Sequence, residues 1–246
     1  MFIEFCLPVH NEEKILKSNV LKLFDYCNNQ NFDFIWQIVI INNGSQDNSE
    51  KICKELSDKY KKIKIENIKQ AGKGCALKFY WQKSNADIIV YMDIDLAVSL
   101  KNIPDLINPI TKENYDLTIG SRLLPDSKIK RSFIRELSSQ VYNFLSRIIL
   151  NHNFSDLQCG FKAIRTDIFK KIAPHIKNNE WFFDTELFVF AKYFGYKIEE
   201  IPVNWNENRY NQRKSKVNLI KDSIKFLINL IKLKIRLIEE KNIKIK

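Results

Sequence analysis

The chain has 246 residues, of which 45% are hydrophobic; this suffices for one large α/β domain or two small ones and argues against global disorder. Its formal net charge is +11, but residues 206–246, with 12 basic and 4 acidic residues, account for +8 and residues 1–205 for only +3. The basic character is therefore local. It favours an anionic partner for the C-terminal region, lipid or nucleic acid, over a generally basic protein.

Cysteine usage and the N-terminal sequence indicate a cytoplasmic protein. The five cysteines are scattered and include no C-x-x-C pair, which favours a reducing compartment over a disulfide framework. The first residues run directly into a strand-like segment, so we predict no signal peptide. No 18 consecutive residues are apolar, so we predict no membrane-spanning helix.

The first half of the chain alternates short apolar runs with segments of helical periodicity. Strands are predicted at residues 2–7, 34–41, 63–66 and 88–92, and helices at 12–27, from 47 or 48 to 60, and at 72–82. This alternation is the signature of βαβ units, and it predicts an α/β fold with a mainly parallel central sheet flanked by helices.

The pattern loosens after residue 95. Helices are predicted at 100–110, 134–150, 166–173, 184–194 and 217–238, strands at 116–119 and 198–203, and a strand or loop at 156–163. In the last helix Lys and Arg recur between apolar pairs, which suits an amphipathic anchor at a membrane interface. A helix packed on the core with a solvated basic side explains the pattern equally well. We therefore predict a main domain at 1–216 and a basic amphipathic helix at 217–246.

Polar residues follow each of the first four predicted strands. They are Asn11 and Glu12, then Asn43 and Asp47, then Lys73 within Gly72–Gly74, and finally Asp93 and Asp95. Each alone reads as a turn or helix-start residue, but the carboxyl ends of parallel strands meet at one sheet edge, where ligands bind. Glycines at a helix start let backbone N–H groups approach phosphate. Paired carboxylates suit Mg²⁺ or Mn²⁺ carrying a diphosphate. Together they predict a nucleotide site.

These motifs also carry a resemblance. The inverting family 2 glycosyltransferases, which have the Rossmann-like GT-A fold, resemble this chain in P-V-H-N-E at 8–12, N-N-G-S-Q-D at 42–47, G-K-G-x-A-L at 72–77 and D-I-D at 93–95. Later motifs resemble the polyprenyl-phosphate sugar transferases, and most closely the dolichyl-phosphate β-glucosyltransferases. These are G-S-R at 120–122, D-L-Q-C-G-F-K at 156–162, W-F-F-D-T-E-L at 181–187 and V-N-W at 203–205. The resemblance runs from about residue 2 to 235.

The resemblance implies roles for individual residues. The nucleotide sugar would be bound by Pro8, Asn11, Glu12, Asn43, Asp47, Lys73 and Asp93. The metal would be held by Asp95 and Asp93, and the acceptor phosphate by Arg122, Arg135, Ser139 and Lys216. Among these, Asp93, Asp95, Arg122 and Arg135 would be catalytic.

The chain departs from the family pattern at three places. Asn43 stands where the family commonly has Asp. The mannosyl branch often has Gln at position 97, whereas this chain has Ala97, in agreement with the glucosyl branch. The usual S-S-K or G-S-K is replaced by R-K-S-K at 213–216. Most of the branch also carries membrane helices, and none is predicted here.

The expected chemistry depends on the acceptor. A phosphate monoester has a second pKa of about 6 and is largely a dianion at neutral pH, so it needs no general base. It needs arginines, which bind phosphate in a bidentate manner. If the acceptor is a hydroxyl, Asp184 and Glu186 are candidates for the base; otherwise they are polar residues at a helix start.

We therefore interpret the chain as an inverting transferase that moves a hexose to a polyprenyl phosphate at the cytosolic face of a membrane. UDP-glucose is the favoured donor and GDP-mannose the second choice. An alternative is a family 2 transferase acting on a glycan or lipid-linked saccharide hydroxyl. An alternative of another class, a nucleic-acid-binding protein using the basic tail, lacks a recognition motif, so no nucleic acid is expected.

Overall fold

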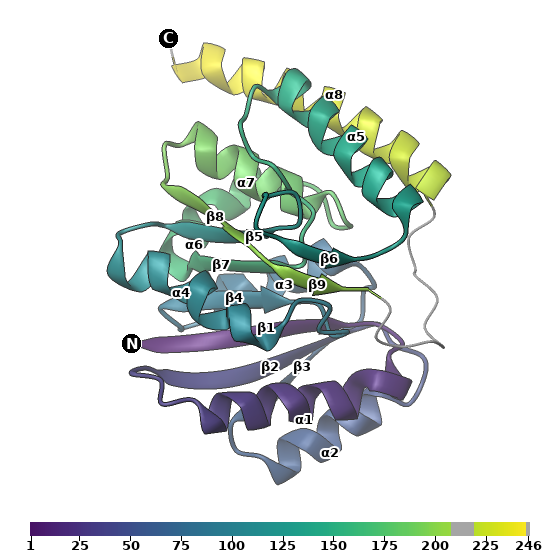
Figure 1. Cartoon of the computed structure of the whole chain (residues 1–246), viewed down its shortest axis with the longest axis vertical. Helices are drawn as coiled ribbons and strands as arrows, with labels where there is room; N and C mark the ends of the chain where they lie inside the picture. Colours follow the sequence, from purple (N-terminus) through teal and green to yellow (C-terminus); the bar gives the residue numbers. More distant parts are fainter. Residues whose placement is uncertain (208–218, 245–246) are drawn as a thin grey trace.

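The computed structural model describes residues 1–207 and 219–244, and its centre is one seven-stranded sheet with the order β3-β2-β1-β4-β7-β5-β8 (Figure 1). The strands are β1 (Phe2–Val9), β2 (Ile35–Asn43), β3 (Ile63–Ile68), β4 (Ile88–Met92), β5 (Leu117–Ser121), β7 (Phe161–Arg165) and β8 (Ile198–Pro202). The strands β1 to β4 are parallel, as predicted, and their order changes direction between β1 and β4. Ligands bind at such switch points in open α/β sheets.

Helices cover both faces of the sheet. On one face lie α1 (Glu13–Asn29), α2 (Ser49–Lys59) and α4 (Ile103–Lys112), and on the other α3 (Lys73–Lys83), α6 (Thr166–Ile172) and α7 (Phe183–Tyr193). Single-turn 3-10 helices at Leu100–Asn102 and Ala173–His175 precede α4 and follow α6. Alternate strand residues serve the two faces: Phe5 packs toward α1 and Cys6 toward α3. Burial on both faces explains why these strands are continuous apolar runs.

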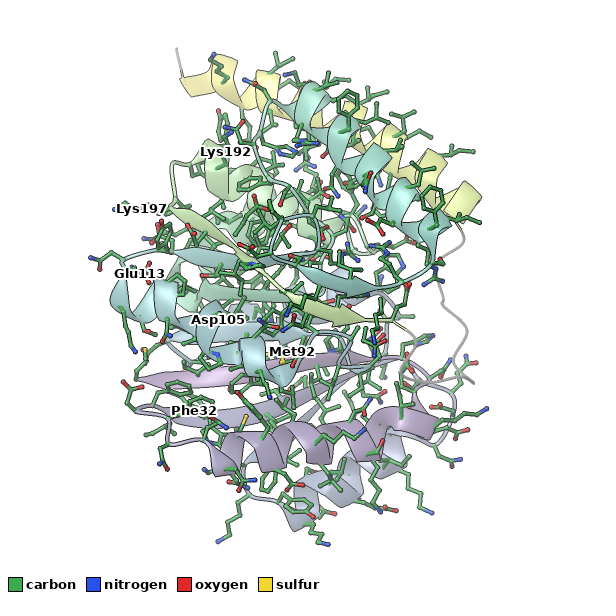
Figure 2. The ribbon with its side chains drawn as sticks, in the orientation of Figure 1. Phe32, Met92, Asp105, Glu113, Lys192 and Lys197 are labelled. Carbon is green, nitrogen blue, oxygen red and sulfur yellow. The ribbon has the colours of Figure 1, made fainter. Side chains whose placement is uncertain are left out.

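One strand of the sheet runs against its neighbours. β7 pairs antiparallel with both β4 and β5, and its first residue, Phe161, lies opposite Met92 at the end of β4. Met92 is buried at this point inside the molecule (Figure 2). The segment predicted as strand or loop at 156–163 is therefore a loop up to residue 160, and this loop lies beside Asp93.

A second, two-stranded sheet was not predicted. It pairs β6 (Lys128–Lys130) with β9 (Asn204–Asn206), which stand more than 70 residues apart in the chain. Trp205 of β9 also forms an isolated bridge with Val98. This sheet brings the V-N-W segment to the loop that follows the two aspartates.

Two long helices, α5 (Phe133–Leu150) and α8 (Leu219–Lys244), lie side by side across one end of the molecule (Figure 1). Leu230 and Leu233 of α8 are buried in the same core cluster as α7. Residues 217 and 218, and the predicted domain boundary at 216, lie outside the described residues. No helix of the described segments is long and apolar enough to cross a membrane.

Ion pairs also fasten α8 to the rest of the chain. Arg236 pairs with Glu186 and donates to the carbonyl of His175, and His175 Nδ1 lies 2.9 Å from Glu240 Oε1. The helix is therefore packed on the core along one side, and its other side is exposed.

Candidate active site

A cleft of about 970 Å³ lies where β1, β2 and β4 end, and it continues between α5 and α8. Nine of the predicted site residues line it: Pro8, Glu12, Asn43, Lys73, Asp93, Asp95, Arg122, Arg135 and Ser139. Asn11, Asp47, Asp184 and Glu186 are not among its described lining residues, and Lys216 lies outside the described residues. The strand-end loops thus converge as predicted, although not all of their polar residues face the cleft.

Asn43 joins three loops at the cleft wall. Its side-chain Nδ2 donates to the carbonyl of Val9 at 2.8 Å, and its Oδ1 accepts from the N–H of Gly72 at 3.0 Å. An aspartate here could accept from Gly72 but could not donate to Val9. The amide at this position therefore fits the loop contacts of this chain.

Asn11 and Asp47 join the loops after β1 and β2 at a distance from the cleft lining. Asn11 Oδ1 accepts from the N–H of Gln46 at 2.7 Å, while Asp47 accepts from the N–H groups of Glu13 and Ser49. Partial burial would raise the pKa of Asp47, but the hydrogen bonds from Ser49 and Glu13 lower it. The carboxylate stabilises the first turn of α1.

Asp93 is held from two sides. Its N–H donates to the carbonyl of Gly160 at 3.1 Å, and the buried hydroxyl of Tyr91 donates to its Oδ1. Burial, and then the charge of Asp93, raises the pKa of Tyr91, so Tyr91 remains a donor. A Cβ atom on Gly160 would lie 1.8 Å from Asp93 Oδ2, so only glycine leaves room for this carboxylate.

Asp95 is placed by the turn that follows β4. The N–H of Leu96 donates to the carbonyl of Asp93 at 3.0 Å, and Leu96 has a left-handed φ of 49°. Asp95 Oδ1 accepts from the N–H of Ala97 at 3.1 Å, and the residue lines the cleft. Within the described segments no three His, Cys, Asp or Glu residues gather as a complete metal site. A metal bound by Asp93 and Asp95 would therefore take further oxygen ligands from a substrate or water.

A buried charge network lies behind the cleft wall at Lys73. Asp184 Oδ2 is 2.6 Å from Lys73 Nζ, and its Oδ1 is 3.2 Å from Lys162 Nζ. Burial lowers the pKa of Lys162, and Asp184 opposes this shift. Only Lys73 of the three lines the cleft.

Glu186, the other candidate base, is also engaged by protein groups. It accepts from the N–H groups of Lys177 and Asn178 at 2.8 and 2.7 Å and pairs with Arg236. A base role for Asp184 or Glu186 stays a prediction, and both carboxylates have other partners in the described chain.

Three arginines, Arg122, Arg131 and Arg135, also line the cleft, and we call this part of it the arginine end. Arg122 forms a bidentate pair with buried Asp156, at 2.6 and 2.9 Å, and its guanidinium lies 4.8 Å from the ring centre of Trp205. Burial would raise the pKa of Asp156, but Arg122 outweighs it and lowers the pKa. Arg135 pairs with Glu207.

The third arginine, Arg131, was not predicted. Its Nη2 donates to the carbonyl of Arg135 at 2.5 Å, while its Nε and Nη1 are buried without a hydrogen-bond partner among the described residues. Burial, and then the proximity of Arg122, lowers the pKa of Arg131. Unsatisfied cationic donors beside the cleft are suited to an anion.

Comparison with known proteins decides the family. The model of the family "Glycosyl transferase family 2" matches residues 4–173. The chain belongs to glycosyl transferase family 2.

Relatives of this family 2 glycosyltransferase share most of its length. Dolichyl-phosphate beta-glucosyltransferase ALG5D of Trichomonas vaginalis is 30% identical, with 95% of this chain and 73% of that protein covered. The Saccharomyces cerevisiae dolichyl-phosphate beta-glucosyltransferase is 30% identical, with 94% and 73% covered. Glycosyltransferase AglD of Haloferax volcanii is 28% identical over 89% of this chain, which spans only 35% of that protein.

The fold of the glycosyltransferase matches solved structures as well. Glucosyl-3-phosphoglycerate synthase from Mycobacterium tuberculosis in complex with UDP superposes with a TM-score of 0.66 at 17% identity, covering 94% of this chain and 79% of that one. Its complex with Mn²⁺, UDP and phosphoglyceric acid gives 0.66 at 14% identity, with 94% and 78% covered. The predicted family and GT-A fold are therefore confirmed.

Several residues that build the site of the glycosyltransferase carried no clear signal of their role. Arg131 lies two residues before the start of α5 at Phe133, so helical periodicity gave no signal for it. Asp156 and Gly160 lie within the D-L-Q-C-G-F-K motif, but their contacts with Arg122 and Asp93 depend on the antiparallel course of β7.

We expect Gly160→Ala to displace Asp93. The three atoms nearest the added Cβ would all belong to the Asp93 carboxylate, so the strain falls on that group. A misplacement of about 1 Å in a site can cost about a hundredfold in rate, and we expect a loss of that size in glycosyl transfer with little change in thermal melting. In an Asp93→Ala background Gly160→Ala should cost nothing further. Wild-type activity in Gly160→Ala would contradict the contact.

We expect Asp184→Asn to destabilise the fold, because it leaves Lys73 and Lys162 without their shared counter-charge. Breaking a buried ion pair costs about 3–5 kcal/mol, which a shift of the urea midpoint would report. Asp167→Asn is the control, because its pair with Arg165 is exposed and worth less than about 1 kcal/mol. An unchanged midpoint together with lost transfer would instead favour a base role for Asp184.

Proposed function

We propose that this enzyme transfers a hexose, with glucose favoured, from a nucleoside diphosphate sugar to a polyprenyl phosphate of the dolichyl type. The observation that carries the proposal is one cleft that is lined both by the paired carboxylates and by three arginines. Several relatives at 26–30% identity are named dolichyl-phosphate beta-glucosyltransferases, which supports the same acceptor.

Donor binding is assigned to the strand-end loops. Pro8, Glu12, Asn43 and Lys73 line the cleft. We propose that the first three contact the nucleoside and that Lys73 contacts the diphosphate. UDP-glucose is the favoured donor; solved structures of similar fold hold UDP, and one holds UDP-glucose with Mn²⁺. GDP-mannose is the second choice.

The aspartates fit a divalent cation such as Mg²⁺ or Mn²⁺, because carboxylate oxygens are its preferred ligands. Asp95 and Asp93 would hold the ion, leaving positions for diphosphate oxygens. When bound, the ion neutralises the negative charge that develops on the leaving diphosphate. Tyr91 and Gly160 fix Asp93 in place, so the protein side of this site is built before substrate binds.

Acceptor binding is assigned to the arginine end. A phosphate dianion is nucleophilic without a base, so the requirement is to hold its oxygen in line with the sugar. That oxygen forms a bond to the anomeric carbon from the opposite side while the bond to the diphosphate breaks, which inverts the configuration. Arg122, Arg131, Arg135 and Ser139 are the groups placed to bind the acceptor phosphate, and Lys216 is proposed to join them.

A substrate panel tests this function. We expect transfer from UDP-glucose to dolichyl phosphate to exceed transfer from GDP-mannose, because the glucosyl-type motifs surround the cleft. The measurement is radiolabel moved into the organic phase, with the product hydrolysed to identify a β-linked hexosyl phosphate. The control acceptor is dolichol, which lacks the phosphate. Transfer to dolichol or to glycan hydroxyls, but not to dolichyl phosphate, would refute the assignment.

We also propose that the outer sides of α5 and α8 contact an anionic membrane surface, as expected for a peripheral enzyme acting on a lipid at its cytosolic face. Both helices expose large apolar side chains away from the core (Figure 2). Outside the cleft lining they are Phe133, Phe144 and Ile148 of α5, and Ile224, Ile228, Ile231, Ile235 and Ile238 of α8. Exposed apolar side chains on both helices, together with exposed Lys225 and Lys232 on α8, combine burial with charge attraction.

We expect the protein to float with anionic liposomes at low salt and less with neutral ones. Each basic residue near the surface contributes about 1 kcal/mol, so changing Lys221, Lys225, Lys232 and Lys234 together to Glu should release the protein. The charge-matched control changes four lysines near the opposite end of the molecule, Lys51, Lys54, Lys59 and Lys61, and should still float (Figure 1). Equal flotation with neutral and anionic liposomes would refute the contribution of the lysines to membrane binding. No flotation with either would refute the proposed contact of α5 and α8 with a membrane.

A further inference from the structure

The loop before α7, residues 177–181, packs against the G-K-G turn at the start of α3, and we call it the clamp loop. A Cβ atom on Gly72 would lie 2.7 Å from the carbonyl oxygen of Asn179, and one on Gly74 would lie 2.9 Å from that of Glu180. Side chains at these two positions would therefore collide with the backbone of the loop. Both glycines leave room for its close approach.

The clamp loop also forms part of the cleft wall. Glu180 and Trp181 line the cleft, as Lys73 does, and Lys73 Nζ lies 5.2 Å from the ring centre of Trp181. The N–H of Cys75 donates to the carbonyl of Asn179 at 3.0 Å, which joins the first turn of α3 to the loop. The position of the clamp loop therefore determines where Lys73 and Trp181 stand in the cleft.

One buried carboxylate holds the clamp loop. Glu186 is 3% exposed, and its Oε2 accepts from the N–H groups of Lys177 and Asn178 at 2.8 and 2.7 Å. Its Oε1 accepts from Arg236 of α8. Hydrogen bonds to an ionised acceptor are the stronger kind, so the start of the loop is firmly held. Both oxygens are thus engaged by protein groups, and Glu186 is not among the described residues that line the cleft.

We propose that Glu186 is a positioning residue for donor binding, which holds the clamp loop against the G-K-G turn and so places Lys73 and Trp181. The inference rests on the proposed function for the identity of the donor. It gives Glu186 a role other than that of a base, because a base must come within hydrogen-bond reach of the substrate. Since Arg236 pairs with the same carboxylate, the inference also connects α8 to the donor-binding loop.

Calorimetric titration of UDP in Mn²⁺ tests this role without requiring the reaction. We expect Glu186→Ala to weaken UDP binding at least about tenfold, because two buried N–H groups lose their acceptor and the loop is released. Glu186→Gln keeps an oxygen for these N–H groups and should bind UDP within about threefold of wild type. The matched control is Glu4→Ala. Glu4 is also 3% exposed and accepts from Tyr80 and Ser84, but it lies outside the cleft lining, so UDP affinity should not change.

Acrylamide quenching of tryptophan fluorescence reports the clamp loop independently of any ligand. Of the four tryptophans, Trp181 is 36% exposed, whereas Trp36, Trp81 and Trp205 are 8% exposed or less. Quenching therefore reports Trp181 above the others. We expect stronger quenching in Glu186→Ala than in Glu186→Gln or wild type, and the added change Trp181→Phe should remove the difference.

Gly74→Ala displaces the clamp loop from its other side and provides a second variant. The added Cβ would lie 2.7 Å from Phe183 Cβ as well as against the Glu180 carbonyl. Alanine is otherwise the better helix former, so the fold should persist, and thermal melting verifies this. We expect the same loss of UDP affinity as in Glu186→Ala, and little further loss when the two changes are combined, because both act on one loop.

The outcomes distinguish this inference from the proposed function. Wild-type UDP affinity in Glu186→Ala, or an equal loss in Glu4→Ala, would overturn the positioning role. Normal UDP affinity with transfer lost in both Glu186→Ala and Glu186→Gln would assign Glu186 as the base instead. If UDP binding follows the expected pattern but no sugar reaches dolichyl phosphate, the proposed acceptor is wrong and the positioning role remains. Binding of GDP in place of UDP, weakened in Glu186→Ala, would correct the donor and support the same role.

Discussion

The candidate site depends on the contact between Asp93 and Gly160. β4 ends at Met92, and the antiparallel strand β7 begins opposite it, so the loop before β7 passes directly beside the first carboxylate. Without a side chain at Gly160 the carboxylate fits against the backbone, where Tyr91 also donates to it. A parallel strand in this position would begin at the other edge of the sheet. The reversed strand therefore fixes one of the two proposed metal ligands.

Buried charges organise the rest of the cleft. Lys73 and Lys162 both pair with Asp184, and Arg122 pairs with Asp156, so each of these three cations has a carboxylate behind it. Such pairs cost desolvation energy, but they hold a charged group in one orientation. Lys73 and Arg122 both line the cleft wall, as Asp93 does. The protein thus presents fixed cations where a diphosphate and a second phosphate are proposed to meet.

Local patterns in the sequence predicted the parallel half of the sheet and the residues at its strand ends. Asn11 and Asp47 carry the same local signal as Glu12 and Asn43, yet they do not line the cleft. The direction in which a loop side chain points depends on the neighbouring loops, which a local pattern does not describe. Antiparallel pairing of β7 gives Asp156 and Gly160 their roles. The role of Trp205 depends on the pairing of two three-residue strands that are far apart in the chain, and such short strands show little periodicity in the sequence. Amphipathicity was predicted for the last helix, but its place beside the exposed apolar residues of α5 required the packed structure.

The central claim is that Asp93 and Asp95 hold a cation that binds the donor diphosphate. Calorimetric titration of UDP into the protein, in Mn²⁺ and in EDTA, tests it most directly. The account predicts measurable UDP affinity in Mn²⁺, a loss of at least about tenfold in EDTA or in Asp95→Asn, and near wild-type affinity in Arg135→Ala, because that arginine belongs to the acceptor end. Equal UDP affinity in Mn²⁺ and EDTA, unaffected by Asp95→Asn, would contradict it.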